Sequence, residues 1–179
     1  MILPIRQYRP AVFLDRDGVL NIDHGYVHTR ENFHWISGAK DAIKYLNDKG
    51  YLVILVTNQS GIGRGYYSEK SFHELMELIC KELLQIGAHI DDIFFCPHHP
   101  REALGEYKKD CHCRKPKSGM IDQAQKKMKI NMAYSFVIGD SEKDMKLAEN
   151  KGIPGFLFKG GNLFQFTRKV LAKIKKGNV

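Results

Sequence analysis

The strongest constraint on the fold of this chain is a repeated alternation of short apolar segments with longer amphipathic ones. The apolar segments are typical of buried parallel strands, and they lie at 11–14, 51–58, 93–95, 134–139 and 156–158. The amphipathic segments carry apolar residues at helical spacing near 39–49, 68–85, 119–129, 142–151 and 163–176. This alternation predicts an α/β fold: a three-layer sandwich with a Rossmann-like, doubly wound, mainly parallel sheet between two layers of helices.

The length and composition of the chain fit a single domain that spans residues 1–179 and has no separate cap domain. Apolar residues make up 43% and charged residues 27% of the sequence, as in soluble globular proteins. Residues 1–10 contain no apolar stretch of signal-peptide length, and no segment approaches the length of a membrane span. We therefore expect a cytoplasmic monomer that has no membrane partner.

Two aspartates end the first apolar segment. In an extended chain, residues i and i+2 point the same way, so Asp15 and Asp17 can face one site at the carboxyl end of this strand. Ligands of open α/β sheets bind beyond these strand ends. Two neighbouring carboxylates need a positive partner, and Mg²⁺, which prefers oxygen ligands, is the simplest one. An ordinary polar turn is the alternative, because aspartate and glycine are common in turns.

Three further segments favour a shared site over a chance turn. Thr57 ends the second apolar segment, Arg114 and Lys115 place two cations before a predicted helix, and Asp140 follows the apolar residues of 134–139. In addition, residues 58–65 (Asn-Gln-Ser-Gly-Ile-Gly-Arg-Gly) predict a glycine-rich loop. Such a loop before a helix can direct backbone N–H groups toward a phosphate.

The order of these residues along the chain resembles that of the haloacid dehalogenase superfamily of phosphohydrolases, from residue 11 to about residue 158. The resemblance implies that Asp15 is the nucleophile that forms an aspartyl-phosphate, and that Asp17 is the general acid and base. Thr57 and Lys115 correspond to the residues that stabilise the transferred phosphoryl group. Mg²⁺ is expected on the Asp15 carboxylate, the Asp17 backbone carbonyl and Asp140.

A second group of ligand-type residues lies in the aperiodic segment between 96 and 113. Cys96, His98, Cys111 and Cys113 form a complete tetrahedral set for a structural Zn²⁺. A disulfide is the alternative, and His99 or His112 could replace His98. Since three thiolates and one imidazole leave no open position, we expect this zinc to have no catalytic role.

The Cys-x-His and Cys-x-Cys pairs before Arg114 and Lys115 resemble the branch containing the D-glycero-D-manno-heptose 1,7-bisphosphate phosphatases and the histidinol-phosphate phosphatases. The length of this zinc loop favours the heptose enzymes, which implies removal of the 7-phosphate of a sugar bisphosphate in nucleotide-activated heptose biosynthesis for lipopolysaccharide or surface glycans. Histidinol phosphate is the second expectation, and a polynucleotide 3′-phosphatase the third. The resemblance implies a substrate site made of Asp23, His24, Gly25, Tyr26, Asn58, Gln59, Ser60 and Arg114. Ser141 departs from the branch, where a lysine is common.

The formal charge of +8 leaves two interpretations of the surface. Basic residues gather at 126–129 and 168–176, which is consistent with a solvated basic face or with binding to nucleic acid. No interleaved aromatic stripe accompanies these residues. We therefore expect a small-molecule sugar phosphate as the partner, and no nucleic acid.

Overall fold

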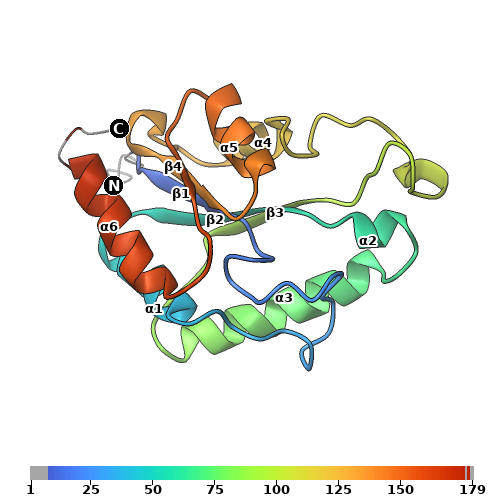
Figure 1. The fold of residues 1–179 in the computed structure, drawn as a ribbon, viewed down its shortest axis with the longest axis horizontal. Coiled ribbons are helices and arrows are strands. Elements are labelled where there is room, and N and C mark those ends of the chain that lie inside the picture. Colours follow the sequence, from blue (N-terminus) through green and yellow to red (C-terminus); the bar gives the residue numbers. More distant parts are fainter. Residues whose placement is uncertain (1–7, 176, 178–179) are drawn as a thin grey trace, which may run out of the picture.

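In the computed structural model of the chain, which describes residues 8–175 and 177, five parallel strands form one sheet in the order β3-β2-β1-β4-β5 (Figure 1). The strands are β1 (Ala11–Leu14), β2 (Leu52–Asn58), β3 (Asp92–Cys96), β4 (Phe136–Gly139) and β5 (Gly155–Leu157). The direction of winding reverses between β1 and β4, which is where a ligand crevice is expected in such sheets. The predicted parallel sheet is confirmed.

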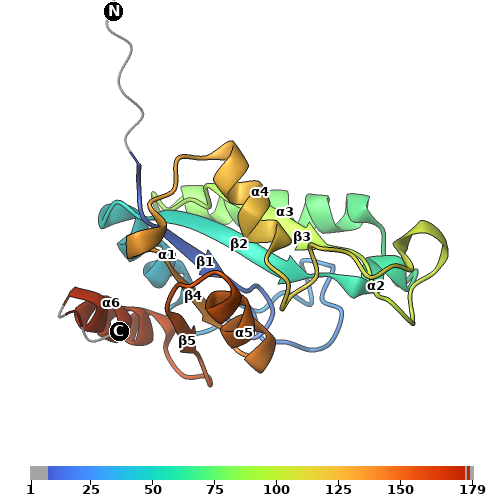
Figure 2. The same ribbon diagram turned by 90° about the horizontal axis from the view of Figure 1, so that it is seen from above.

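Helices cover both faces of this sheet (Figures 1 and 2). One face carries α1 (Ala39–Asp48), α3 (Glu69–Leu84) and α6 (Leu163–Lys175), and the other carries α4 (Gly119–Lys127) and α5 (Glu142–Asn150). Each of these five helices lies where helical spacing predicts it, within a few residues at its ends. Short helical turns form α2 (Ser60–Gly63), η1 (Gly105–Tyr107) and η2 (Met132–Tyr134). Among the described residues, no helix is both long and apolar enough to cross a bilayer.

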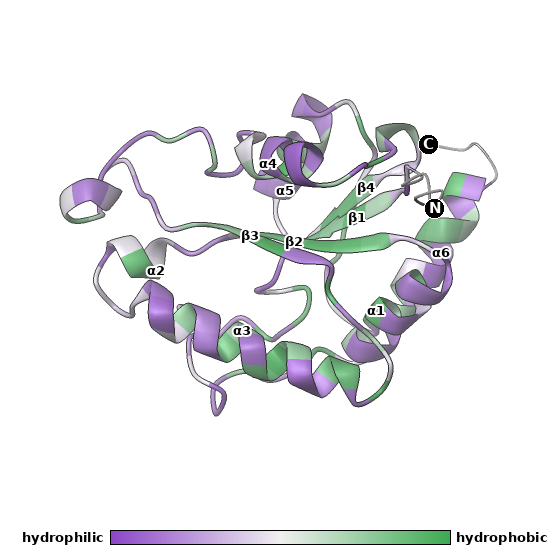
Figure 3. Cartoon of the chain, turned by 180° about the vertical axis from the view of Figure 1, so that it is seen from behind, coloured by the Kyte–Doolittle hydropathy of each residue, from purple (hydrophilic) through white to green (hydrophobic). Residues whose placement is uncertain are grey.

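Two apolar clusters hold the three layers together. Successive side chains of a strand point to opposite faces, so Val12 and Leu14 of β1 pack with α1, α3 and α6, whereas Ala11 and Phe13 pack with α4 and α5. All four side chains are buried. Figure 3 shows the same pattern, with hydrophobic central strands and helices that alternate hydrophobic and hydrophilic residues. Because both faces of the sheet are covered, polar groups gather at the strand ends.

The glycine-rich segment at 58–65 differs from the predicted loop, because it contains the helical turn α2. Its glycines serve close packing: a Cβ at Gly61 would lie 2.3 Å from Tyr67 Cε1, and one at Gly63 would lie 2.4 Å from the Pro97 carbonyl oxygen. Leu104 N–H also donates to the Gly63 carbonyl over 2.7 Å, which connects α2 to the long loop after β3. The glycines therefore let two chain segments approach each other.

Two long irregular segments lie beyond the carboxyl ends of the strands. Residues 15–38 contain no helix or named strand, yet Leu20, Val27 and Phe33 are buried in the core. Residues 97–118 contain only η1 and extend past β3 toward α2 (Figure 1). Glu82 of α3 anchors the first segment, because its carboxylate accepts hydrogen bonds from Arg30 Nε (2.6 Å) and Trp35 Nε1 (2.9 Å).

Candidate active site

Asp15 and Lys115 form an ion pair at the carboxyl end of β1. Asp15 Oδ1 lies 2.9 Å from Lys115 Nζ, which also donates to Asp144 Oδ1 over 2.6 Å. The side chains of Lys115 and Asp144 are buried, and that of Asp15 is nearly so. One buried ammonium group is thus fixed between two carboxylates that come from different elements.

The pKa values of these groups show strong mutual influence. Burial raises the pKa of Asp15 to about 7, while the Lys115 charge opposes the rise and the Asp144 charge adds to it. Burial alone would lower the pKa of Lys115, but the two carboxylates outweigh it, so the pKa of this lysine is raised. Lys115 therefore stays protonated, and a further cation at the site would favour ionised Asp15.

Three side chains hold the Asp17 carboxylate. Arg16 Nη2 donates to both oxygens at 2.7 and 2.8 Å, Asn21 Nδ2 donates to Oδ1 at 3.0 Å, and Gln59 Nε2 donates to Oδ2 at 2.9 Å. Arg16 is fully buried and also donates to the Val27 carbonyl over 2.6 Å. These contacts fix the direction of the Asp17 side chain at the edge of the site.

Asp140, at the end of β4, completes a group of oxygen ligands. Asp15, Asp140 and Asp144 each offer one carboxylate oxygen, and the three oxygens lie within 4.8 Å of one another. Such a hard, oxygen-only donor set fits Mg²⁺. Asp144 is already engaged by Lys115 and by the Ser141 hydroxyl (2.6 Å), so Asp15 and Asp140 are the better cation ligands. Gly18 allows this arrangement, because its φ is +81° and a Cβ there would lie 2.1 Å from Asp140 Oδ2.

The end of β2 contributes Thr57 and Asn58. Thr57 Oγ1 accepts a hydrogen bond from Gln59 Nε2 over 2.8 Å. Asn58 clasps the backbone of Lys115: its Oδ1 accepts from the Lys115 N–H at 3.0 Å, and its Nδ2 donates to the Lys115 carbonyl at 3.3 Å. Asn58 therefore places the lysine at the strand ends, although Lys115 lies in a loop.

A pocket of about 380 Å³ opens over these groups. It is lined by most of the residues that sequence patterns predict for the site: Asp15, Asp17, Asp23, Gly25, Tyr26, Thr57, Asn58, Gln59 and Lys115. Residues from the 15–38 segment, β2 and the loop before α4 thus meet at one place, although Asp15 and Lys115 are far apart in the chain.

Three predicted substrate residues do not line this pocket. His24 is exposed and packs edge to face on His34, at 5.5 Å between ring centroids. Ser60 begins α2, where its carbonyl accepts from Arg64 N–H. Arg114 Nη1 donates to the His98 carbonyl over 3.0 Å. Each is close in sequence to a lining residue, but local backbone direction takes it out of the pocket wall.

Three lining residues, Tyr67, Ser141 and Lys143, are not among the predicted site residues. Tyr67 follows the glycine-rich segment without any periodic pattern. The position of Lys143 is a sequence signal that could have identified it: it lies in the first turn of α5, where the helix dipole favours acidic residues over basic ones. A lysine at such a position indicates a role other than helix stability.

Cys96, His98, Cys111 and Cys113, the Cys/His cluster, converge beyond β3. The three sulfur atoms lie 3.2–3.3 Å apart, and His98 Nδ1 lies 3.4 Å from Cys113 Sγ and 3.7 Å from Cys96 Sγ. All three cysteines are free thiols, so the alternative disulfide is not formed. Hydrogen bonds from Cys96, with others from Cys111 and His98, lower the pKa of Cys113 to about 5. The cluster could hold a metal ion, and its soft donors suit zinc.

The two alternative histidine ligands lie outside this cluster. His99 Nδ1 accepts from the backbone N–H groups of Arg101 (3.3 Å) and Glu102 (3.1 Å). His112 Nε2 lies 2.9 Å from an oxygen of Asp122. Neither imidazole is available to replace His98 in the arrangement observed.

Comparison with known proteins identifies the family of this chain. Residues 12–154 match the family model described as polynucleotide kinase 3 phosphatase. A D-glycero-β-D-manno-heptose-1,7-bisphosphate 7-phosphatase of Rhodopseudomonas palustris is 46% identical over 171 residues, which cover 96% of this chain and 95% of the relative. One of Haemophilus ducreyi is 52% identical over 146 residues, covering 81% and 80%. This chain belongs to the heptose-bisphosphate phosphatase family.

A solved structure from this family supports the haloacid dehalogenase-like fold. The D,D-heptose 1,7-bisphosphate phosphatase of B. bronchiseptica, complexed with magnesium and phosphate, is 32% identical to this chain and superposes with a TM-score of 0.76. The match covers 92% of this chain and 86% of the other. Family membership makes this chain a phosphoric monoester hydrolase, as its strand-end residues predict.

Three basic side chains, Arg64, Arg114 and Lys143, act on His99, and we call them the positive edge. Burial lowers the pKa of His99, and the charges of Arg114, Arg64 and Lys143 lower it further. The Glu102 carboxylate, which pairs with Arg64 and lies 3.7 Å from His99 Nε2, opposes these charges, and Lys143 also lines the pocket. Lys143 forms no ion pair with any described residue, and its side chain is exposed. The edge has a free cation although Ser141 replaces the usual lysine.

Proposed function

We propose that this chain hydrolyses the 7-phosphate of D-glycero-β-D-manno-heptose 1,7-bisphosphate by a Mg²⁺-dependent route through an aspartyl-phosphate. The observation that carries the proposal is the placement of Asp15, Asp17, Thr57 and Lys115 around one open pocket at the strand ends. The identity with relatives that bear this activity in their names supports the choice of substrate. Their shared β designation favours the β anomer.

The Asp15 carboxylate attacks phosphorus in line with the bond to the sugar oxygen, and the phosphoryl group moves to Asp15. Lys115 offsets the negative charge of the transferred oxygens, and the Thr57 hydroxyl donates to one of them. Asp144 keeps Lys115 in position through its 2.6 Å contact. Asp15 and Asp140, with the Asp17 backbone carbonyl, would hold Mg²⁺, which supplies further charge for the same oxygens.

Asp17 acts first as an acid and then as a base. It protonates the departing sugar oxygen, which is a poor leaving group without a proton. The resulting carboxylate then takes a proton from the water that attacks the aspartyl-phosphate, so that Asp15 and inorganic phosphate are released. Both steps need the Asp17 side chain to face the pocket, which it lines in this structure.

The phosphate that remains on the sugar needs its own cations. Arg114, whose planar guanidinium suits bidentate phosphate contact, and Lys143, on the pocket wall, lie near His99 at the positive edge. We assign them to the 1-phosphate, with Lys143 in place of the lysine that Ser141 replaces. Asp23, Gly25 and Tyr26 contact the sugar from the 15–38 segment.

We further propose that the Cys/His cluster holds a structural zinc. It lies in a segment whose only regular element is η1, so metal ligation would order residues that have little core of their own. We also propose that the chain functions as a single domain and as a monomer.

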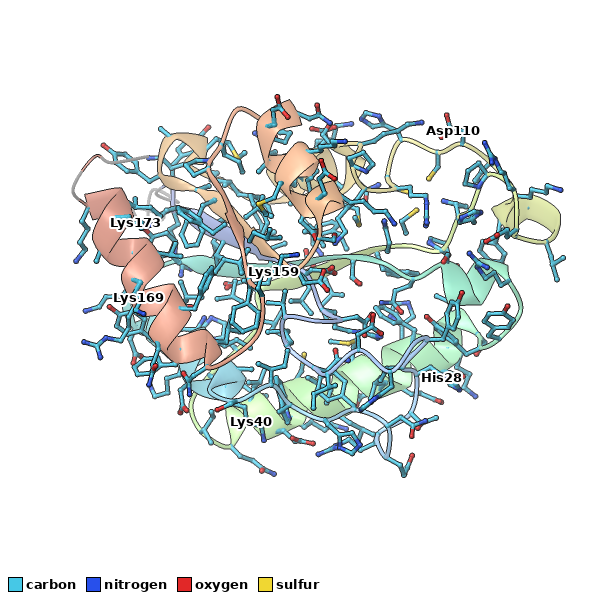
Figure 4. All side chains as sticks on the ribbon, viewed as in Figure 1. His28, Lys40, Asp110, Lys159, Lys169 and Lys173 are labelled. Carbon is cyan, nitrogen blue, oxygen red and sulfur yellow. The ribbon has the colours of Figure 1, made fainter. Side chains whose placement is uncertain are left out.

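Two other substrates are weaker candidates. Histidinol phosphate has no second phosphate for the positive edge. A polynucleotide 3′-phosphate fits the name of the matching family model, but the lysines labelled on α6, Lys169 and Lys173, lie on the outer side of that helix, away from the strand ends (Figure 4).

The test is a comparison of kcat/KM for the α and β heptose 1,7-bisphosphates, histidinol phosphate and a 3′-phosphorylated oligonucleotide, with native protein and with Arg114→Ala. We expect the β bisphosphate to be the best substrate and to lose the most from the substitution. Histidinol phosphate should change little. If histidinol phosphate or the oligonucleotide is the best substrate, the assignment of a heptose bisphosphate is wrong, and the phosphatase chemistry alone remains.

A further inference from the structure

A buried pair of side chains, Gln59 and Tyr67, lies behind the acid and base of the site. Gln59 is 2% exposed and Tyr67 9% exposed. Tyr67 Oη donates to Gln59 Oε1 over 2.6 Å, while Gln59 Nε2 donates to Asp17 Oδ2 at 2.9 Å and to Thr57 Oγ1 at 2.8 Å. The Gln59 amide therefore connects Asp17 and Thr57, two residues of the proposed reaction. The Tyr67 hydroxyl holds the oxygen of that amide.

The charge of Asp17 determines which way the amide faces. If the amide were flipped, Gln59 Oε1 would face Asp17 Oδ2, and in the ionised form of Asp17 two acceptors would meet without a proton between them. In the orientation observed, the NH₂ group uses its two hydrogens on Asp17 and Thr57, and Oε1 is satisfied by Tyr67. Burial raises the pKa of Tyr67 to about 12, so its hydroxyl remains a donor at neutral pH.

The same contacts determine what Thr57 can offer to a substrate. A threonine hydroxyl has one hydrogen to donate and can accept further hydrogen bonds. Because Thr57 Oγ1 accepts from Gln59, its own hydrogen is left to point into the pocket. The amide thus leaves Thr57 as a donor toward a phosphoryl oxygen and braces Asp17, which Arg16 and Asn21 hold from its other sides.

Neither hydrogen-bonding end of Gln59 is left for a substrate. Its oxygen and both of its hydrogens have protein partners, and nearly all of its surface is buried. This differs from the role in substrate binding that the sequence resemblance implies for this residue. His28 packs flat on the Tyr67 ring, at 4.7 Å between centroids, which limits movement of the phenol.

We propose that Gln59 and Tyr67 are positioning residues: Tyr67 orients the Gln59 amide, which holds Asp17 for proton transfer and Thr57 for phosphate contact. The proposal rests on the proposed phosphatase reaction but not on the identity of the sugar. It predicts that substitution of Gln59 or Tyr67 slows the reaction more for a substrate whose departing group needs a proton than for one whose departing group does not. Substitution of a substrate-binding residue would instead raise KM.

The test uses Tyr67→Phe, with Tyr66→Phe as the matched control, because Tyr66 is the exposed neighbour and does not line the pocket. Single turnovers with enzyme in excess report only formation of the aspartyl-phosphate. Two substrates are compared: p-nitrophenyl phosphate, whose phenolate leaves unprotonated, and the best alkyl phosphate that the native protein hydrolyses. Gln59→Glu, which keeps the acceptor for Tyr67 but places a second carboxylate against Asp17, provides a second variant, and circular dichroism checks the fold of each.

For Tyr67→Phe we expect the alkyl rate to fall roughly tenfold, the p-nitrophenyl rate to fall less than threefold, and KM to stay within twofold. Gln59→Glu should show the same asymmetry with roughly a hundredfold loss of the alkyl rate, and Tyr66→Phe should change neither rate. Equal losses with both substrates, or a KM increase without a loss in rate, in folded variants would overturn the proposal. If native protein hydrolyses histidinol phosphate rather than a heptose bisphosphate, the sugar assignment fails while this asymmetry is still expected.

Discussion

The strand-end site and the Cys/His cluster both gather charged or ligating side chains from distant parts of the chain, but different forces hold them. At the strand ends, Asp15 follows a buried strand, and Lys115, although it is in a loop, is clasped by Asn58 and paired with Asp15 and Asp144. The Cys/His cluster has one ligand at the end of β3, and its other ligands lie in a segment with only a single 3₁₀ turn. The packed sheet builds the first site, whereas a metal ion would order the second.

This difference predicts opposite consequences of mutation in the two regions. Charges at the strand ends should serve chemistry and lower stability, because burial raises the pKa of Asp15 to about 7 and the like charges of Asp144 and Asp17 add to the rise. Ligands of the cluster should serve stability and leave the chemistry intact.

The largest effect is expected from Asp15→Asn. Loss of the nucleophile should lower kcat by several orders of magnitude. The melting temperature should stay the same or rise, since a buried carboxylate is removed while Lys115 keeps Asp144. Initial rates and thermal denaturation measure the two effects, with Asp41→Asn on the exposed side of α1 as the control. A variant that retained a tenth of native turnover would contradict a nucleophilic role.

Cys113→Ser should have the opposite effect, with a loss of stability and little change in turnover. We expect the zinc content to fall and the melting temperature to drop by about 5–10 °C, which corresponds to roughly 2–4 kcal/mol for a chain of this size. The rate of the remaining folded protein should change by less than threefold. Cys80→Ser on α3, far from the cluster in sequence, is the control and should retain zinc. Loss of turnover out of proportion to loss of folded protein would show that the cluster participates in the chemistry.

Lys143→Ala tests the positive edge. Removal of this cation should raise KM for the heptose bisphosphate roughly tenfold, equivalent to about 1.4 kcal/mol, and leave a monophosphate substrate unaffected. Lys146→Ala is a matched control on the same helix, because Lys146 is exposed and lies 3.6 Å from Glu142. An equal change in KM for mono- and bisphosphate substrates would show that Lys143 does not bind the second phosphate.

A smaller effect is expected from Glu82→Gln, which affects the anchor of the 15–38 segment. Burial opposes ionisation of Glu82, but hydrogen bonds from Trp35, Lys40 and Arg30 outweigh it and lower the pKa to about 2. Its contribution to stability is therefore present above its ordinary pKa of 4.5 and is lost as pH falls from 4.5 toward 2.

Urea denaturation should show Glu82→Gln less stable than native protein by about 2 kcal/mol at pH 7, with a smaller difference at pH 3. Glu77→Gln, which removes one exposed partner of Lys81 on the same helix, should leave the stability unchanged at both pH values. A Glu82 effect that is independent of pH would mean that packing, rather than the charge of the carboxylate, anchors the segment.

Sequence patterns predict those parts of the molecule that depend on local periodicity. The strand at Ala11–Leu14, the i and i+2 spacing of Asp15 and Asp17, and the paired ligands of the Cys/His cluster are all local signals. Which neighbours of these residues face the pocket depends on tertiary packing. Gln59 and Ser60 are adjacent in the chain, yet one lines the pocket and the other begins α2. Lys143 could be assigned to the site only after the structure placed α5 beside the pocket.

The central claim is that one region uses a metal for chemistry and the other uses a different metal for structure. Metal content and turnover measured on the same purified protein test it most directly. We expect about one tightly held zinc per chain, no turnover after mild treatment with EDTA that leaves this zinc in place, and full recovery on addition of Mg²⁺ alone. Zinc-free protein with native stability and turnover, or turnover that follows zinc rather than Mg²⁺, would contradict this account.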